Sequence, residues 1–272
     1  MRRSWSLYVG TVLVGLVMLL AVVSLFWTPF DPLHVDASAR LLGPGWPHLM
    51  GTDNLGQDIF SRTLVGARVC IQVGVIAVAI GAVIGVPLGM AAAASRSWLG
   101  QLIMRAADIV YAFPALLLAI LFAAAKGGGS IATSMTAIGI ASVPAFARIA
   151  RGSALQVLNQ DYVLAARASG IGPLRIGATH VAPNIAPVVL VQASVSFGLA
   201  ILAEAALSYL GLSAPLNTPT WGRMLYDSQQ YIFTNPNLAL WPGLFIALAV
   251  LGFNLLGDGL RDRFDPTLVE VR

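Results

Sequence analysis

The chain of 272 residues is strongly apolar, because 57% of its residues are hydrophobic and only 10% are charged. This composition excludes an ordinary water-soluble domain and is typical of a membrane protein. The formal net charge of +4 at pH 7 is small, so it does not indicate a nucleic-acid partner. We therefore expect an all-α membrane protein.

Six apolar segments are long enough to cross a hydrocarbon core of about 30 Å, which requires roughly 20 helical residues. The first, residues 7–26, is longer than the core of a signal peptide. It ends in bulky Phe26 and Trp27 rather than in a small-residue cleavage site, so we expect it to be retained. The others are predicted at residues 70–94, 103–125, 131–150, 185–209 and 238–257. The sequence thus predicts six transmembrane helices.

The arginine distribution predicts the orientation of these helices. Arginine residues dominate the N-terminus and alternate loops, at Arg2, Arg3, Arg96, Arg105, Arg148, Arg151, Arg167 and Arg175. Positive charges favour the cytoplasmic side, so both termini are predicted to be cytoplasmic. The resulting division has four parts: residues 1–28 with the first helix, an extracytoplasmic segment 29–68, a transmembrane domain 69–260 containing a cytoplasmic loop 152–184, and a cytoplasmic tail 261–272.

Two outer segments are predicted to form the mouth of a pathway. The Pro, Gly and Trp content of residues 29–68 predicts an ordered cap. Its stretch GTDNLGQDIFSR is either an amphipathic helix at the membrane interface or a contact for solute or partner. In residues 213–237, the stretch PTWGRML predicts a short re-entrant or surface helix, with Trp221 as an interface anchor. The candidate residues of the outer mouth are Trp46, Glu204, Trp221 and Arg223.

The second span carries a ridge of small residues. Ala77, Gly81, Gly85 and Gly89 recur every four residues, which lets another helix approach closely. Packing is the expected purpose, and the alternative is a flexible gate with a kink at Pro87. Pro114 and Pro144 similarly interrupt the third and fourth spans.

Few side chains suggest chemistry within the membrane. Counting about 1.5 Å per residue from Ile185 places Glu204 near the outer interface, where it is either hydrogen-bonded for structure or part of the outer mouth. The lone Cys70 begins the second span as a packed thiol. His34, His48 and His180 lack metal-ligand spacing, so no metal site is predicted.

The polar stretch Asp161–Asn184 interrupts the apolar segments and predicts two short helices with a hinge. Gly170 can adopt the left-handed conformation that ends a helix, and Pro173 suits the first turn of the next helix. Small Ala165 and Ala166 leave one face open to another protein.

This stretch resembles the cytoplasmic loop of bacterial ABC importer permeases. Ala165, Ala166, Gly170 and Pro183 have the spacing of that loop, whereas Leu164, His180 and Ala182 depart from the general pattern. Tyr162–Gly170 and His180–Asn184 fit the YVxAARxxG and HxxPN patterns of the dipeptide, oligopeptide and nickel branch. GTDNLGQDIFSR and FNLLGDGLRDRFDP are similar to two further signatures of that branch. The ATPase-coupling residues that the resemblance implies are Asp161, Tyr162, Ala165, Ala166, Arg167, Gly170, His180, Pro183 and Asn184.

The resemblance implies a type I ABC importer permease fold in a bacterial inner membrane. The implied partners are a second homologous permease, two ABC ATPases, an extracytoplasmic solute-binding protein and membrane lipid. The only lysine, Lys126, follows Ala125, so the chain lacks a P-loop and is not expected to hydrolyse ATP. We expect no catalytic residue and no cofactor on this chain, because ATP and magnesium would bind the partner ATPases.

The predicted cargo is a di- or oligopeptide, with nickel as the alternative because QYIFTNP is reminiscent of nickel importers. Two other classes fit less well. An ion-driven transporter should show intramembrane acids and inverted repeats, and a membrane enzyme should show a catalytic motif such as HExxH or GxSxG.

Overall fold

The computed structural model describes residues 5–95, 98–125, 128–213, 215 and 217–264. Arg2, Arg3, Arg96, Lys126 and the tail from Asp265 onward lie outside these residues. In the described part of the chain, all regular secondary structure is helical, and β-type pairing is limited to one isolated bridge between Thr52 and Asp58. The chain is therefore an all-α protein, as predicted.

Five continuous segments are long and apolar enough to cross a membrane. They contain α1 (Trp5–Phe26), α2 (Ile59–Ala94), α5 (Ile131–Leu158), α8 (Ala182–Tyr209) and α10 (Asn237–Phe264). The short helices are η1 (Ala37–Ala39), α6 (Asp161–Ala168), α7 (Pro173–Ile176), the π-helical turn η2 (Gly177–Val181), α9 (Trp221–Ser228) and η3 (Gln229–Tyr231). The short helix expected in residues 213–237 is thus confirmed as α9.

The predicted continuous helix at residues 103–125 is broken. Helices α3 (Trp98–Ala112) and α4 (Ala115–Ala125) meet at an angle of 85°, and together they make a sixth span only if the bent pair is counted as one. Pro114 lies at the break, where its ring and its missing N–H oppose a continuous helix. The expected interruption at Pro114 is therefore a sharp bend rather than a tolerated kink.

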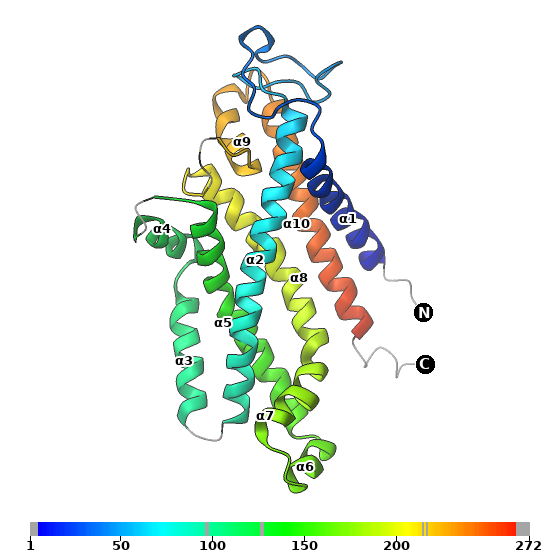
Figure 1. Ribbon diagram of the computed structural model, residues 1–272, viewed down its shortest axis with the longest axis vertical. Coiled ribbons are helices and arrows are strands. Elements are labelled where there is room, and N and C mark those ends of the chain that lie inside the picture. Colours follow the sequence, from blue (N-terminus) through cyan, green and yellow to red (C-terminus); the bar gives the residue numbers. More distant parts are fainter. Residues whose placement is uncertain (1–4, 96–97, 126–127, 214, 216, 265–272) are drawn as a thin grey trace.

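Helix α2 is the central element and runs through most of the length of the molecule (Figure 1). It begins at Ile59 rather than at residue 70, so its 36 residues extend for about 54 Å, well beyond a hydrocarbon core. Its glycine ridge faces α5: a Cβ atom on Gly85 would lie 2.5 Å from the Val143 carbonyl oxygen, and one on Gly81 would lie 2.9 Å from the Ser142 Cβ. The packing role of the ridge is confirmed.

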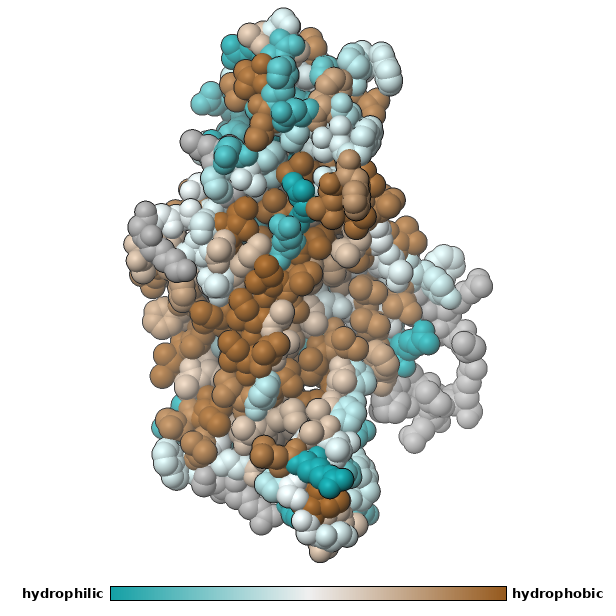
Figure 2. Space-filling view, in the orientation of Figure 1, coloured by the Kyte–Doolittle hydropathy of each residue, from teal (hydrophilic) through white to brown (hydrophobic). Residues whose placement is uncertain are grey.

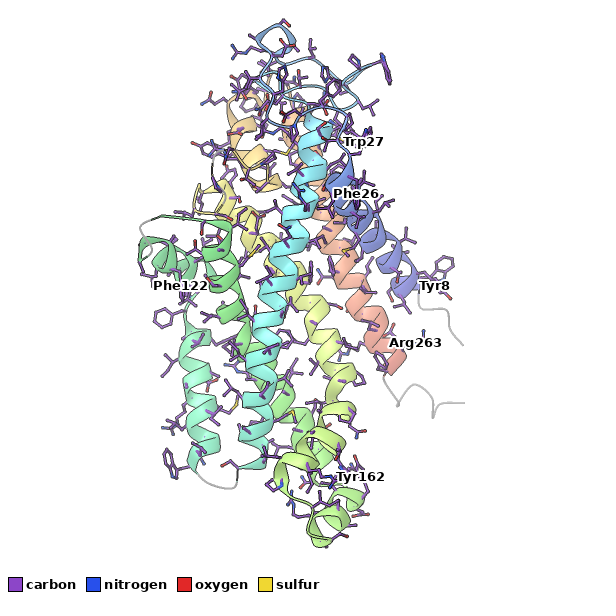
Figure 3. All side chains as sticks on the ribbon, viewed as in Figure 1. Tyr8, Phe26, Trp27, Phe122, Tyr162 and Arg263 are labelled. Atoms are coloured by element: carbon purple, nitrogen blue, oxygen red, sulfur yellow. The ribbon has the colours of Figure 1, made fainter. Side chains whose placement is uncertain are left out.

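Helices α1 and α10 pack antiparallel along one side of α2 and α8 (Figure 1). Their backbones approach closely at glycines, since a Cβ on Gly259 would lie 2.5 Å from the Leu7 Cα. Tyr8 and Arg263 mark one end of this pair, and Phe26 and Trp27 mark the other (Figure 3). The start of α1 and the end of α10 therefore lie on the same side of the molecule.

Hydrophobic side chains dominate the middle of the surface, whereas hydrophilic ones gather at the end formed by residues 29–58 (Figure 2). Inside, the largest core joins α1, α2, α8 and α10, where the rings of Phe197 and Phe253 stack 3.9 Å apart. Cys70 is buried here at 2% exposure, so the expected packed thiol is confirmed.

Candidate coupling loop and outer mouth

The loop between α5 and α8 forms one end of the molecule, opposite residues 29–58 (Figure 1). It consists of α6, a turn at residues 169–172, α7 and η2, which continues into α8. The predicted arrangement of two short helices with a hinge is confirmed. Asp161 lies in the first turn of α6 and Arg167 in its last, where each charge complements the helix dipole.

Gly170 closes α6 with a left-handed backbone. Its φ is +80°, its N–H donates to the Arg167 carbonyl, and the N–H of Ile171 donates to the Ala166 carbonyl at 3.1 Å. Non-glycine residues pay a steric cost in this conformation. Since a Cβ here would meet no atom within 4 Å, the requirement for glycine comes from the backbone and not from packing.

Helix α6 has one buried face and one open face. Val163 is fully buried against Ala150, Ile176 and other residues of a small apolar core. On the opposite side Ala165 is exposed, whereas Ala166 is half-buried. A small, exposed side chain in this position leaves room for another helix or a groove to seat against α6.

His180 connects the two halves of the loop. Its ring stacks on Tyr162 with centroids 6.1 Å apart, and its Nδ1 is 2.6 Å from the Thr179 hydroxyl. The Asn184 amide donates to the His180 carbonyl at 2.6 Å, and Pro183 is exposed beside it. Tyr162 itself lies near the tip of the molecule (Figure 3). Most of the predicted coupling residues are therefore brought into one compact surface.

A groove of about 690 Å³ adjoins this surface, and no sequence motif predicted it. It lies between the end of α2, which includes Met90, and the α6–α7 segment, which includes Leu174. Leu174 is 90% exposed. The groove went unpredicted because its walls are about 80 positions apart in the chain.

At the opposite end, Trp46 and Trp221 have different environments. Trp46 is 91% exposed, whereas Trp221 is only 2% exposed. The Trp221 indole N–H donates to the Thr63 carbonyl at 3.1 Å, and its ring lies against Gly66. The expectation that Trp221 anchors the protein at the membrane interface is corrected, because the missing side chain of Gly66 opens a slot that buries the indole.

The stretch GTDNLGQDIFSR forms the cap of α2 rather than a separate amphipathic helix. Asp58 is the N-cap residue, and its carboxylate accepts hydrogen bonds from the Ser61 N–H and hydroxyl at 2.7 Å. Asp53 accepts from the N–H groups of Leu55 and Gln57. Asp58 thus satisfies an orphan N–H of the first turn of α2, and Asp53 satisfies two N–H groups of the loop before it, which explains why acidic residues occur at these positions.

Arg62 is the centre of a buried charge network that sequence reasoning missed. Its guanidinium donates to Asp53 and Gln57 in the loop before α2, which we call the cap together with the rest of residues 29–58, and it lies 3.7 Å from Asp227 on α9. Arg223 also pairs with Asp227, at 3.1 Å. Burial raises the pKa of Asp227 above its usual value, against the opposing effect of Arg223 and Arg62. The network joins the cap, α2 and α9.

Glu204 is 3% exposed and lies near the C-terminal end of α8. Its carboxylate accepts a hydrogen bond from the Ser208 hydroxyl at 2.6 Å. This enclosure favours the hydrogen-bonded structural role over a place in an open mouth.

Several apolar helices, joined by an exposed helix–hinge–helix loop at one end, define a polytopic membrane protein. Its fold matches that of a solved structure described as inward facing conformations of the MetNI methionine ABC transporter. The TM-score is 0.63, over 75% of this chain and 97% of that chain, at 17% sequence identity.

Residues 85–270 match the family described as the binding-protein-dependent transport system inner membrane component, and the chain belongs to this family. It is 41% identical to a dipeptide transport system permease protein DppC of Alkalihalophilus pseudofirmus, over 98% of this chain and 88% of that protein. It is 40% identical to a glutathione transport system permease protein GsiD of Pectobacterium atrosepticum, over 98% and 91%. The chain is therefore a non-catalytic permease of the ABC importer type.

Proposed function

We propose that the chain is a pathway-forming subunit of an ATP-driven importer for di- or oligopeptides in a bacterial inner membrane. The observation that carries this proposal is the 41% and 40% identity, over 98% of the chain, to permeases named for dipeptide and glutathione transport. A second permease completes the pathway, and two ATPases bind ATP and magnesium outside this chain.

The ATPases act through the coupling loop. When ATP binds, the two partner ATPases close against each other. Their movement must then be transmitted to this chain through a compact, rigid element that contacts them. Helix α6 is suited to this role because Val163 fixes its inner face while Ala165 is exposed on its outer face. The loop side is then cytoplasmic, as are both termini. A periplasm-active reporter after Gly128 should be active and one after Gly172 inactive, and the reverse result would contradict this topology.

The cap and α9 receive the solute-binding protein on the outer side. Trp46 and Phe233, 91% and 99% exposed, are the positions best suited to test this docking. Photo-crosslinkers placed there should capture the binding protein, whereas one at buried Trp221 should not. Capture from Leu174 on the coupling side, but from neither outer position, would contradict the assignment.

The cargo is tested with the complete transporter in proteoliposomes that contain the binding protein. Labelled dipeptide should enter only with ATP, and an excess of unlabelled dipeptide should compete, whereas nickel should not. Uptake of labelled nickel without uptake of dipeptide would replace the peptide assignment with the nickel alternative. Uptake that follows an ion gradient and ignores ATP would contradict the importer class itself.

A further inference from the structure

Helix α3 carries a polar stripe beside an apolar one. The buried face, which includes Met104 and Ala107, packs toward α2 and α5. An exposed apolar stripe contains Leu102, Ile109 and Phe113. A second exposed stripe is polar and contains Gln101, Arg105 and Asp108, which recur at spacings of four and three residues. One side of α3 suits lipid, and the adjacent side suits water.

Helix α5 continues this polar surface. Arg148, Gly152 and Gln156 are exposed and recur every four residues. An Arg148 nitrogen lies 2.7 Å from an Asp108 carboxylate oxygen, and the guanidinium lies 4.2 Å from the centre of the Tyr111 ring. Helices α3 and α5 run in opposite directions (Figure 1). Moving from Asp108 toward the start of α3 therefore follows the same direction as moving from Arg148 toward the end of α5, so the two polar stripes lie side by side.

The cluster of Asp108, Tyr111 and Arg148 is open and lies next to a break in the chain. The side chains of Asp108 and Arg148 are 57% and 42% exposed, and Tyr111 is 57% exposed. Within one turn, the backbone bends by 85° between α3 and α4. At membrane depth, irregular backbone and charged side chains are tolerated where protein or a water-filled cavity covers them. Both observations therefore indicate that this face borders water or another protein rather than lipid.

We propose that Asp108, Tyr111 and Arg148 bind the charged ends of a short peptide on the wall of the pathway. This rests on the proposed function and names a contact site within it. Arg148 can exchange Asp108 for the peptide carboxylate, with which a guanidinium forms two parallel hydrogen bonds. Asp108 then accepts the peptide ammonium group, and the Tyr111 ring borders the site. The exchange leaves no unpaired charge, because both the ion pair and the peptide are neutral overall.

The first test asks whether the polar stripe borders water. The only cysteine, Cys70, is buried, so a thiol reagent should label an introduced cysteine on this chain with little background. Ala112→Cys extends the polar stripe, and Ile109→Cys, three positions earlier, lies on the apolar stripe. In the complete transporter in inside-out vesicles, a charged methanethiosulfonate should label Ala112→Cys at least about tenfold faster, because a charge enters lipid poorly. Equal rates at the two positions would overturn the proposal.

The second test asks whether peptide binds there. Dipeptide and binding protein enclosed in the vesicles, with ATP added outside, should slow the labelling of Ala112→Cys. Adding Arg148→Gln or Asp108→Asn should weaken this protection about tenfold, as expected from losing a charge-assisted hydrogen bond. Arg148→Lys keeps the charge and should keep part of the protection. Protection that persists in both neutral variants would show that the pair only braces α3 against α5, and would overturn the proposal.

The parent transporter separates this proposal from the proposed function. Its ATP-dependent dipeptide uptake is measured first in proteoliposomes, and the amount of inserted protein is measured for every variant. Absence of uptake in the parent contradicts the peptide importer. Normal uptake together with unprotected Ala112→Cys contradicts only the contact site.

Discussion

The two ends of the molecule are built differently. At the end formed by residues 29–58 and α9, Arg62 and Trp221 are buried and have partners within the chain. At the coupling end, Ala165 and Leu174 are exposed, and an apolar groove lies beside them. The end formed by residues 29–58 is therefore stabilised by contacts within the chain, whereas the end formed by α6 and α7 exposes small and apolar side chains. Stability should respond to changes at the first end and transport to changes at the second.

The largest expected effect on stability comes from Arg62→Met. Removing the guanidinium leaves the buried Asp53 carboxylate without its cationic partner, while Asp227 keeps Arg223, and an uncompensated buried charge costs about 3–5 kcal/mol. The measurement is the thermal unfolding of the purified protein in detergent. The matched control is Arg223→Met, which removes a partly exposed charge and should cost about 1 kcal/mol or less. Equal losses for the two variants would show that the network does not hold the cap.

A somewhat smaller loss is expected from Gly66→Val. A Cβ at this position would lie 2.5 Å from the Trp221 Cδ1, so the indole must leave its slot. Overpacking of this kind costs about 1–3 kcal/mol. Gly15→Val, where a Cβ meets no atom within 4 Å, is the control and should leave the melting temperature nearly unchanged. A Gly66→Val protein as stable as the parent would mean that Trp221 is not packed as described.

The smallest effect concerns pH. Burial raises the pKa of Asp227 above its usual value of 3.8, so the stability given by its neutral form is present below that pH and is lost as pH rises through the folded-state pKa. Asp227→Asn should remove this fall in the free energy of unfolding with rising pH. The fall is about 1 kcal/mol or less, because the side chain is partly exposed.

Asp36 supplies the opposite sign. Hydrogen bonds from Ser38 lower its pKa, so its contribution is present above 3.8 and is lost as pH falls. Melting temperatures of Asp227→Asn, Asp36→Asn and the parent between pH 2 and pH 7 test both signs. Parallel curves for all three proteins would contradict the stated environments.

Local sequence features predicted much of the fold. The small-residue ridge predicted close packing of the second span, and Gly170 predicted the end of α6. The start of α2 was missed because Arg62 and Arg68 interrupt the apolar run, although a helix continues beyond the membrane when its polar groups find partners. The bend at Pro114 was located, but proline alone does not determine its angle.

Contacts between distant segments were not predictable from the sequence. Trp221 is buried because of Gly66, which lies 155 positions earlier. Asp108 and Arg148 pair across 40 positions, and each alone resembles an ordinary charge near a membrane surface. Hydropathy reveals which segments are apolar, but not which polar side chains of two helices meet.

The central claim is that α6 transmits the action of the ATPases, and Ala165→Trp tests it most directly. Ala165 is preferable to half-buried Ala166 because a large side chain there disturbs the partner contact without disturbing the core. Leu19→Trp on α1, at a residue that is 59% exposed, is the matched control. Dipeptide uptake per inserted molecule and co-purification of the ATPases are measured for both variants. We predict that Ala165→Trp lowers both at least about tenfold, as expected when a large side chain blocks an interface centre, while the control retains both. Parent values of uptake and co-purification in Ala165→Trp would contradict the coupling role.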